Sequence, residues 1–343
     1  MASSSSSSRK SEVEFSLPVI DISSYVSRGS SRDPRGIPVS DCKLVSRSLK
    51  EFGAFIVKDI RWSLPDYDIF HEDIETFFKS LSNTPHLQKQ FGVPEEVPMT
   101  SVYFWKFARR PENNAPVKDY GVSNVTPCGF PDWNPTMDNW SFNMLGIACM
   151  VAEMAAIGFG LPVDAFTSRI HYGLHTLATI GSNLGKDVQE GTILQACHHN
   201  FNFLTIHGRN KFHGLHIWLR NAARVEVKIP VGCFVIQAGK QLEWLTGGAC
   251  LATNHDIVVT KTTMDVINKM KERDCSLWRV SSSLYVHALS DAILKPLEPF
   301  DKHTVKMAND YPPVPAEYVV REYAEMRHAM QKKILEGDGS SVS

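Results

Sequence analysis

Two spacings of apolar residues divide the chain. Val45, Leu49 and Phe52 follow Ser40 at the helical spacing of three to four residues, and Gly53 comes next. Because Ser favours the first position of a helix and Gly its end, this pattern predicts a helix over residues 40–52. The same reasoning predicts helices over 66–81, 140–158, 262–274 and 315–335. Short strands are predicted over 16–25 and 54–60.

From about residue 169 onward, short segments rich in β-branched and aromatic residues replace the helical spacing. They cover 203–208, 214–219, 225–230, 233–239, 249–260 and 277–289, and turns such as His207-Gly208 and Ala238-Gly239 separate them. Many short strands with turns between them predict a mainly β fold, a double-sheet jelly roll with flanking helices.

This division predicts four parts. Residues 1–15 form a disordered tail, and 16–165 form a mixed helical and strand region packed on the core. Residues 166–300 form the β core, and 301–343 form a C-terminal helix and tail. The segment 111–137 carries five Pro and no regular period, which leaves two interpretations open: a lid at the mouth of a pocket, or a passive surface loop.

Composition narrows the classes of partner. Lys plus Arg number 36 and Asp plus Glu 37, for a formal net charge of -1, so neither nucleic acid nor a membrane surface is favoured as a partner. The seven Cys are scattered without C-x-x-C spacing, which is typical of reduced thiols in a cytoplasmic protein. The apolar run 144–161 contains Glu153, which favours a buried core helix over a membrane span. Oligomeric state is left open.

The candidate chemistry lies in the second half of the chain. His198 and Asn200 are two residues apart in a segment with strand-like alternation, so we expect both side chains on one face. His255 follows in another β-branched segment. Arg279 and Ser281 are again two apart, so we expect them to share a face as well.

This order of residues resembles the H-x-D, distal His and R-x-S pattern of the iron(II)/2-oxoglutarate-dependent dioxygenases, especially the plant-type, isopenicillin N synthase-like members. The segments NFLTIHG and AGKQLEWLTGG are also similar, and the resemblance runs from about residue 18 to 300. It implies a double-stranded β-helix that oxidises a small organic metabolite by hydroxylation, desaturation or cyclisation. It further implies that His198, Asn200 and His255 bind Fe(II), while Arg279 and Ser281 bind the distal carboxylate of the cosubstrate 2-oxoglutarate.

Asn200 departs from the family pattern, because it stands where a carboxylate is expected. A neutral amide oxygen does not offset the charge of the metal, so iron affinity should fall. Family members that halogenate have a small residue there, and the Asn side chain would fill that space. Asp256 and His199 are expected to face away from the site, because adjacent strand residues point to opposite faces.

Three functions stay open on the sequence alone. The first is a 2-oxoglutarate-dependent dioxygenase with a weakened metal site. The second is an oxidase without 2-oxoglutarate, because the N-x-Y helper motif of plant-type relatives is out of step around Tyr172. The third is a catalytically impaired or non-redox ligand-binding relative, which Asn200 favours. His207, His213 and His216 are interpreted as structural or pocket-lining.

Overall fold

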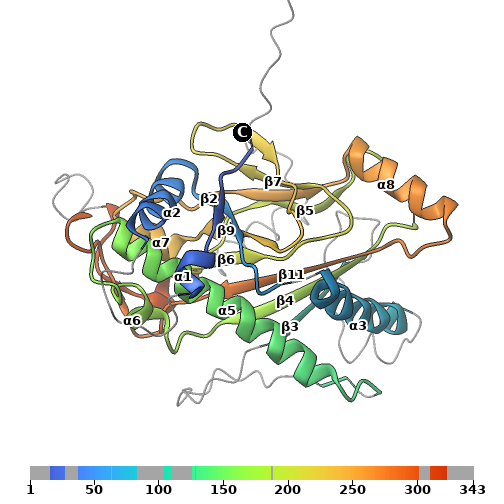
Figure 1. Cartoon of the computed structure of the whole chain (residues 1–343), viewed down its shortest axis with the longest axis horizontal. Helices are drawn as coiled ribbons and strands as arrows, with labels where there is room; N and C mark the ends of the chain where they lie inside the picture. The colour runs from blue at the N-terminus through green and yellow to red at the C-terminus, as the bar shows by residue number, and fades with distance from the viewer. Residues whose placement is uncertain are drawn as a thin grey trace, which may run out of the picture.

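The computed structural model describes residues 16–27, 38–62, 64–82, 104–109, 126–127, 129–186, 188–300 and 310–322. The predicted tail 1–15, the greater part of the predicted loop 111–137 and the end of the predicted C-terminal helix lie outside these residues. Within them the fold is rich in β-sheet, with helices flanking the sheets, as predicted (Figure 1).

Two sheets form the core. The larger has seven strands in the order β1-β2-β9-β6-β11-β4-β3, antiparallel except where β1 pairs with β2. Its strands are β1 (Val19–Asp21), β2 (Ala54–Lys58), β3 (Phe104–Arg109), β4 (Thr176–Asn183), β6 (Leu204–His207), β9 (Cys233–Ala238) and β11 (Trp278–Val286). The smaller sheet has the order β5-β10-β7-β8, from β5 (Ile193–His198), β7 (Leu215–Trp218), β8 (Arg224–Glu226) and β10 (His255–Val258). A third, two-stranded sheet joins β12 (Ile293–Leu294) to β13 (Val314–Pro315).

Three long helices pack against the larger sheet and against one another: α2 (Val39–Phe52), α3 (Leu64–Ser82) and α5 (Trp133–Gly158). The α2 helix ends at Gly53, whose φ of 69° is the left-handed conformation that glycine adopts without strain, so the predicted stop is confirmed. The shorter helices are α1 (Ser23–Ser27), α6 (Thr167–Ile170), α7 (Lys240–Leu245) and α8 (Lys261–Glu272), and residues 316–322 are also helical.

The alternation of side chains on β2 shows how one strand serves two cores. Phe55 and Val57 belong to the hydrophobic cluster that the larger sheet forms with the helices. Ala54 and Ile56 belong to a second cluster, shared with Ile257 of the smaller sheet. Because successive residues of a strand point to opposite faces, an almost wholly apolar strand such as this one is the type that is buried on both sides.

Several predicted boundaries are wrong, for local reasons. The strand predicted over 16–25 ends at Asp21, whose Oδ1 accepts a hydrogen bond from the backbone N–H of Ser23, and α1 begins there. The loop predicted over 111–137 ends before Trp133, because α5 begins at that residue. Pro135 lies in the first turn of α5, where its missing N–H costs no helical hydrogen bond. Strands β3 and β4 were not predicted at all, and the strand predicted through His198 and Asn200 ends at His198 as β5.

The α5 helix is long and apolar enough to cross a membrane by length and composition, although half of the tested window is buried inside the fold. Its contacts are those of a core helix. Trp140 stacks on Phe70 with ring centroids 4.0 Å apart, and its Nε1–H donates a hydrogen bond to Ser282 Oγ at 3.1 Å. The helix is thus joined to α3 and to β11.

One buried histidine makes the stability of the fold depend on pH. His175 is buried, and its Nδ1 accepts a hydrogen bond from the backbone N–H of His287 at 3.2 Å. Burial, followed by the nearby His287, lowers the pKa of His175 to about 3. The folded state therefore keeps this ring neutral, whereas the unfolded chain protonates it below its ordinary pKa of about 6.5.

We predict that the free energy of unfolding falls as the pH drops from about 6.5 towards 3, and that His175→Gln reduces this fall. Between pH 7 and 4.5 the variant should lose about 2–3 kcal/mol less than the unsubstituted protein, since Gln does not titrate and its carbonyl still accepts from His287. Urea unfolding at the two pH values measures the difference. The exposed His171→Gln serves as the control, and an equal acid effect in all three proteins would contradict the prediction.

Candidate functional site

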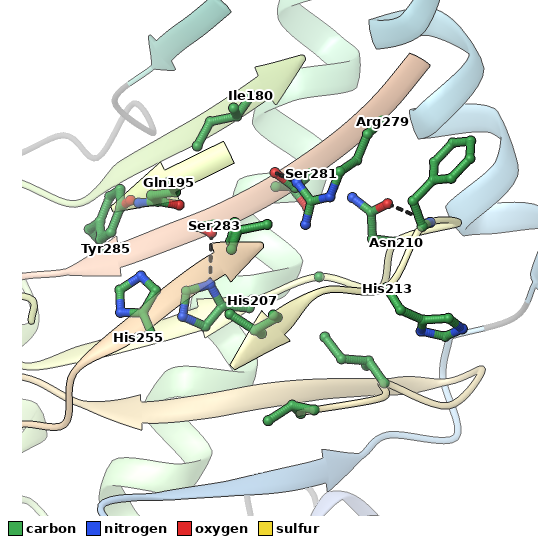
Figure 2. Close-up of a pocket in the computed structure, with 17 residues that line it drawn as sticks. Ile180, Gln195, His207, Asn210, His213, His255, Arg279, Ser281, Ser283 and Tyr285 are labelled. Atoms are coloured by element: carbon green, nitrogen blue, oxygen red, sulfur yellow. Dashed lines mark hydrogen bonds between the residues drawn. The ribbon is translucent and has the colours of Figure 1, made fainter. Parts of the chain in front are cut away.

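A cavity lies between β11 of the larger sheet and the strands of the smaller sheet (Figure 2). It encloses about 550 Å³ of empty space, part of it open to solvent. The polar residues that line it are Gln195, His207, Asn210, His213, His255, Arg279, Ser281, Ser282, Ser283 and Tyr285. Among the described residues that line it there is no Asp or Glu, so the fixed positive charge of Arg279 favours an anionic ligand.

The structure brings His198 and His255 together. They are paired residues of the antiparallel strands β5 and β10, and their ring centroids are 4.3 Å apart. Burial holds the pKa of His255 well below its usual value, so the ring is neutral at pH 7. Its buried Nδ1 has no hydrogen-bond partner within the described part of the chain. A neutral imidazole with an unused ring nitrogen is suited to bind a metal.

The hydrogen bonds of His198 fix which of its nitrogens carries the proton. Nδ1 lies 2.8 Å from the carbonyl oxygen of Ala196, which can only accept, so Nδ1 carries the hydrogen. Nε2 therefore carries the lone pair, and it faces the amide Nε2 of Gln195 at 3.1 Å. A histidine held through Nδ1 by a backbone carbonyl is a common arrangement for a metal ligand that binds through Nε2.

Asn200 does not occupy a strand position. β5 ends at His198, and Asn200 lies in the connection to β6, so the prediction that strand alternation places both side chains on one face is wrong. Its side chain is 7% exposed, and Nδ2 donates a hydrogen bond to Thr205 Oγ1 at 2.8 Å. The amide nitrogen is thus tied to Thr205 of β6, and the role of Asn200 as a metal ligand stays a prediction.

The neighbouring acid forms an ion pair of its own. Asp256 accepts two hydrogen bonds from Arg224, at 2.7 and 3.0 Å, and is absent from the cavity lining, which fits the expectation that it faces away. His199 Nδ1 lies 3.1 Å from Asn254 Oδ1. In the described ranges no three His, Cys, Asp or Glu side chains are grouped so as to hold a metal. The residues fit a metal through two imidazoles and neutral amides, without an anionic ligand.

Arg279 and Ser281 share one face of β11, as predicted, and both line the cavity. Arg279 is 3% exposed, and its Nη1 donates to Ser281 Oγ at 3.4 Å. Its Nε has no partner among the residues described, and burial lowers the pKa of the guanidinium to about 10. Because a buried cation without a counter-charge is unstable, this geometry is that of a site awaiting a carboxylate or similar anion.

His207 lines the cavity and is held in place by two hydrogen bonds. The sequence alone left its role as either structural or pocket-lining. Its Nε2 lies 3.0 Å from Gln237 Oε1, an acceptor, and its Nδ1 lies 2.9 Å from Ser283 Oγ. Nε2 therefore carries the hydrogen, and Nδ1 accepts from the serine hydroxyl. Since both ring nitrogens are engaged, His207 is held beside His255 with ring centroids 5.2 Å apart.

The remaining residues that the sequence singled out differ in whether they line the cavity. His213 lines the cavity, whereas the buried His216 lies 3.0 Å from the carbonyl oxygen of Gly214 through its Nδ1. Tyr172 is 50% exposed and takes no part in the lining.

The sequence reasoning missed Ser283 and Tyr285, although they continue the alternation of Arg279 and Ser281 along β11 and could have been found from it. Gln195 carried no such signal, because it is three residues from His198, and a regular strand would place the two side chains on opposite faces.

No protein-family model matches the chain, and no curated protein sequence matches it. Solved structures do. A protein from Caulobacter crescentus described as belonging to the 2OG-Fe(II) oxygenase family is 19% identical, with a TM-score of 0.70 over 90% of this chain and 98% of that one. A Neurospora crassa protein, solved in complex with alpha-KG and 5-formyluracil, is 16% identical, with a TM-score of 0.71 over 92% and 97%.

A third similar structure is the dioxygenase for auxin oxidation in rice, 14% identical, with a TM-score of 0.61 over 92% of this chain and 95% of that one. Identities this low establish a shared fold and no more. The jelly-roll core with flanking helices predicted from the sequence is thereby confirmed, although the two sheets do not close into a barrel. The chain spans nearly the whole length of these structures.

The buried charge of Arg279, which has no counter-charge among the described residues, leads to a prediction about the stability of the fold. Arg279→Met should raise the free energy of unfolding of the ligand-free protein by about 1–3 kcal/mol, because it replaces a buried cation that lacks a counter-charge among the described residues with an apolar side chain of similar length. Denaturant titration measures the change. Arg224→Met is the matched control and should lower stability, since it leaves the buried carboxylate of Asp256 without its cation. A destabilised Arg279→Met variant would contradict the prediction.

Proposed function

We propose that this protein is an oxidoreductase of the iron(II)/2-oxoglutarate-dependent type that oxidises a small organic metabolite. One observation carries the proposal: the buried guanidinium of Arg279, which has no counter-charge among the described residues, lines the same cavity as His255, and His255 is paired with His198. A ligand that bridges these groups needs a carboxylate at one end and metal-binding oxygens at the other. 2-Oxoglutarate has both.

Each residue has a task that follows from its environment. His198 and His255 would hold the metal through their unprotonated nitrogens, and Arg279 with Ser281 would bind the distal carboxylate through a guanidinium and a hydroxyl. The bound iron(II) would supply redox chemistry with oxygen, and the cosubstrate would supply electrons by oxidative decarboxylation. His207 fixes the adjacent wall, because Gln237 and Ser283 hold both of its nitrogens.

The similar structures support a small-molecule substrate. The Neurospora crassa protein has been solved with thymine, JOX2 with 2OG, Fe and JA, and the rice protein is a dioxygenase for auxin oxidation. Thymine and auxin are compact organic molecules. For this chain we propose the same broad class, with hydroxylation, desaturation or cyclisation as the type of reaction.

One observation favours a second candidate function. The amide of Asn200 is held by Thr205, and no carboxylate among the described residues faces the His198–His255 pair. A protein that binds a carboxylate ligand through Arg279 without redox chemistry needs no anionic metal ligand. Asn200 would then be a structural residue of the loop between β5 and β6.

The substitution Asn200→Asp separates the two candidates. If the site holds iron, the new carboxylate adds an anionic ligand at nearly constant volume, so we predict that iron(II) binds at least about ten-fold more tightly. Turnover of 2-oxoglutarate to succinate should increase with it. Anaerobic titration with iron(II) and succinate quantification provide the two measurements.

Asn210→Asp is the matched control, because it adds the same charge to the same cavity at a position occupied by the Asn210 amide, which donates to Val280 O. It should not reproduce the gain in iron affinity. If neither the unsubstituted protein nor the Asn200→Asp variant binds iron while both remain folded, the oxygenase proposal is wrong. If Asn200→Asp also abolishes carboxylate binding, the non-redox candidate is favoured instead.

A further inference from the structure

We propose that Gln195 supplies a protein ligand of the metal site beside His198 and His255, through its side-chain amide oxygen. The inference rests on the proposed function and extends it to a residue that the motif does not contain. It follows from the local geometry of β5 and from the hydrogen bonds of His198.

An irregularity in strand pairing places Gln195 beside the two histidines. His255 pairs with His198, and Ile257 pairs with Gln195, so the register advances by 257 − 255 = 2 residues on β10 but by 198 − 195 = 3 on β5. The extra residue is a β-bulge. In a regular strand, residues three apart point to opposite faces, but the bulge restores them to the same face.

The lining of the cavity agrees with this register. Gln195, His255 and Ile257 all contribute to it, as residues on one face of the paired strands should. Figure 2 shows Gln195 and His255 as sticks that line the same cavity. The carbonyl of Ala196, inside the bulge, accepts the Nδ1 hydrogen of His198. The bulge therefore both orients His198 and brings Gln195 next to it.

Gln195 lies at the nitrogen that a metal would use. Its amide Nε2 is 3.1 Å from His198 Nε2, the atom that carries the lone pair, so the amide donates its hydrogen there. A metal ion at His198 would displace this hydrogen bond. The amide oxygen and nitrogen have nearly the same size, so rotation of the amide group would present Oε1 to the metal without a change in volume.

Asn200 is held through its amide nitrogen. Its Nδ2 donates to Thr205 Oγ1 at 2.8 Å, and Asn202 Nδ2 donates to the same hydroxyl at 3.0 Å. Thr205 in turn donates to Asn202 Oδ1 at 3.2 Å. This network ties the Asn200 amide nitrogen to Thr205 of β6, so Oδ1 of Asn200 stays a candidate ligand. The half-buried Gln195 makes its hydrogen bond directly to His198, a proposed ligand, and is a further candidate.

Two substitutions at Gln195 test the inference by metal binding, without reference to turnover. Gln195→Glu should tighten iron(II) binding by at least about ten-fold, because it turns a neutral oxygen ligand into an anionic one. Gln195→Leu should weaken it by about ten-fold. Anaerobic calorimetry with iron(II) measures both affinities, the absorption spectrum with cobalt(II) reports the change in ligands, and circular dichroism checks the fold.

The Gln195→Leu variant distinguishes two roles of Gln195: a metal ligand, or a hydrogen-bond donor that only occupies the lone pair of His198. If Gln195 only occupies the lone pair of His198, its removal leaves the nitrogen open and metal binding becomes tighter. Tighter or unchanged binding by Gln195→Leu would therefore overturn the proposal. Gln189→Glu, an exposed residue six positions earlier, controls for the added charge and should leave the affinity unchanged.

A double substitution separates this inference from the proposed function. In the Asn200→Asp background a strong ligand is already present, so Gln195→Leu should weaken metal binding less than it does in the unsubstituted protein. If Asn200→Asp tightens iron binding and Gln195→Leu has no effect in either background, this inference fails and the proposed function stands. If no form binds iron(II) or cobalt(II), both fail together.

Discussion

The antiparallel pairing of β10 with β5 is the constraint on which the candidate site depends. It sets His255 opposite His198, although 57 residues (255 − 198) separate them in the chain. β10 is also paired with β7 on its other side, so its position is fixed within the smaller sheet. The bulge in β5 adds Gln195 to the same face. A slip of one residue in this register would turn the histidines away from each other, because it exchanges the two faces of the strand.

The charge of Arg279 is the second organising feature, and it opposes the stability of the fold. Other buried ionic groups in the described residues are paired, as Asp256 is with Arg224 and Glu243 with Lys240. Arg279 has a hydroxyl at 3.4 Å and an Nε without a partner in the same part of the chain. A protein that retains such a group bears a cost in the ligand-free state and recovers it when an anion binds. This balance is typical of a binding site rather than of a structural ion pair.

The hydrogen bonds around three histidines divide them by task. His207 uses both nitrogens on Gln237 and Ser283, and it is consequently a fixed wall. His198 uses Nδ1 on a backbone carbonyl and directs Nε2 to Gln195, while Nδ1 of His255 has no partner in the described part of the chain. A metal at His198 Nε2 would have to displace the amide of Gln195, whereas Nδ1 of His255 needs no such exchange with the described residues. Since no acidic residue among those described completes this pair, Asn200 and Gln195 are the informative positions.

The sequence by itself determined the class of fold and the common face of the two residues proposed to bind an anion. Alternation is a local property, so β6, β7, β9, β10 and β11 were found from it, as was the common face of Arg279 and Ser281. The stop of α2 at Gly53 was likewise local.

Only the tertiary structure decided how the metal-site residues are arranged. Strand periodicity predicted a shared face for His198 and Asn200, but the strand ends between them, and Thr205 holds the Asn200 amide. Gln195 is three residues from His198, a spacing that a regular strand would place on the opposite face. Its position depends on a bulge defined by pairing with β10, and a pairing between distant segments leaves no period in the sequence of either one.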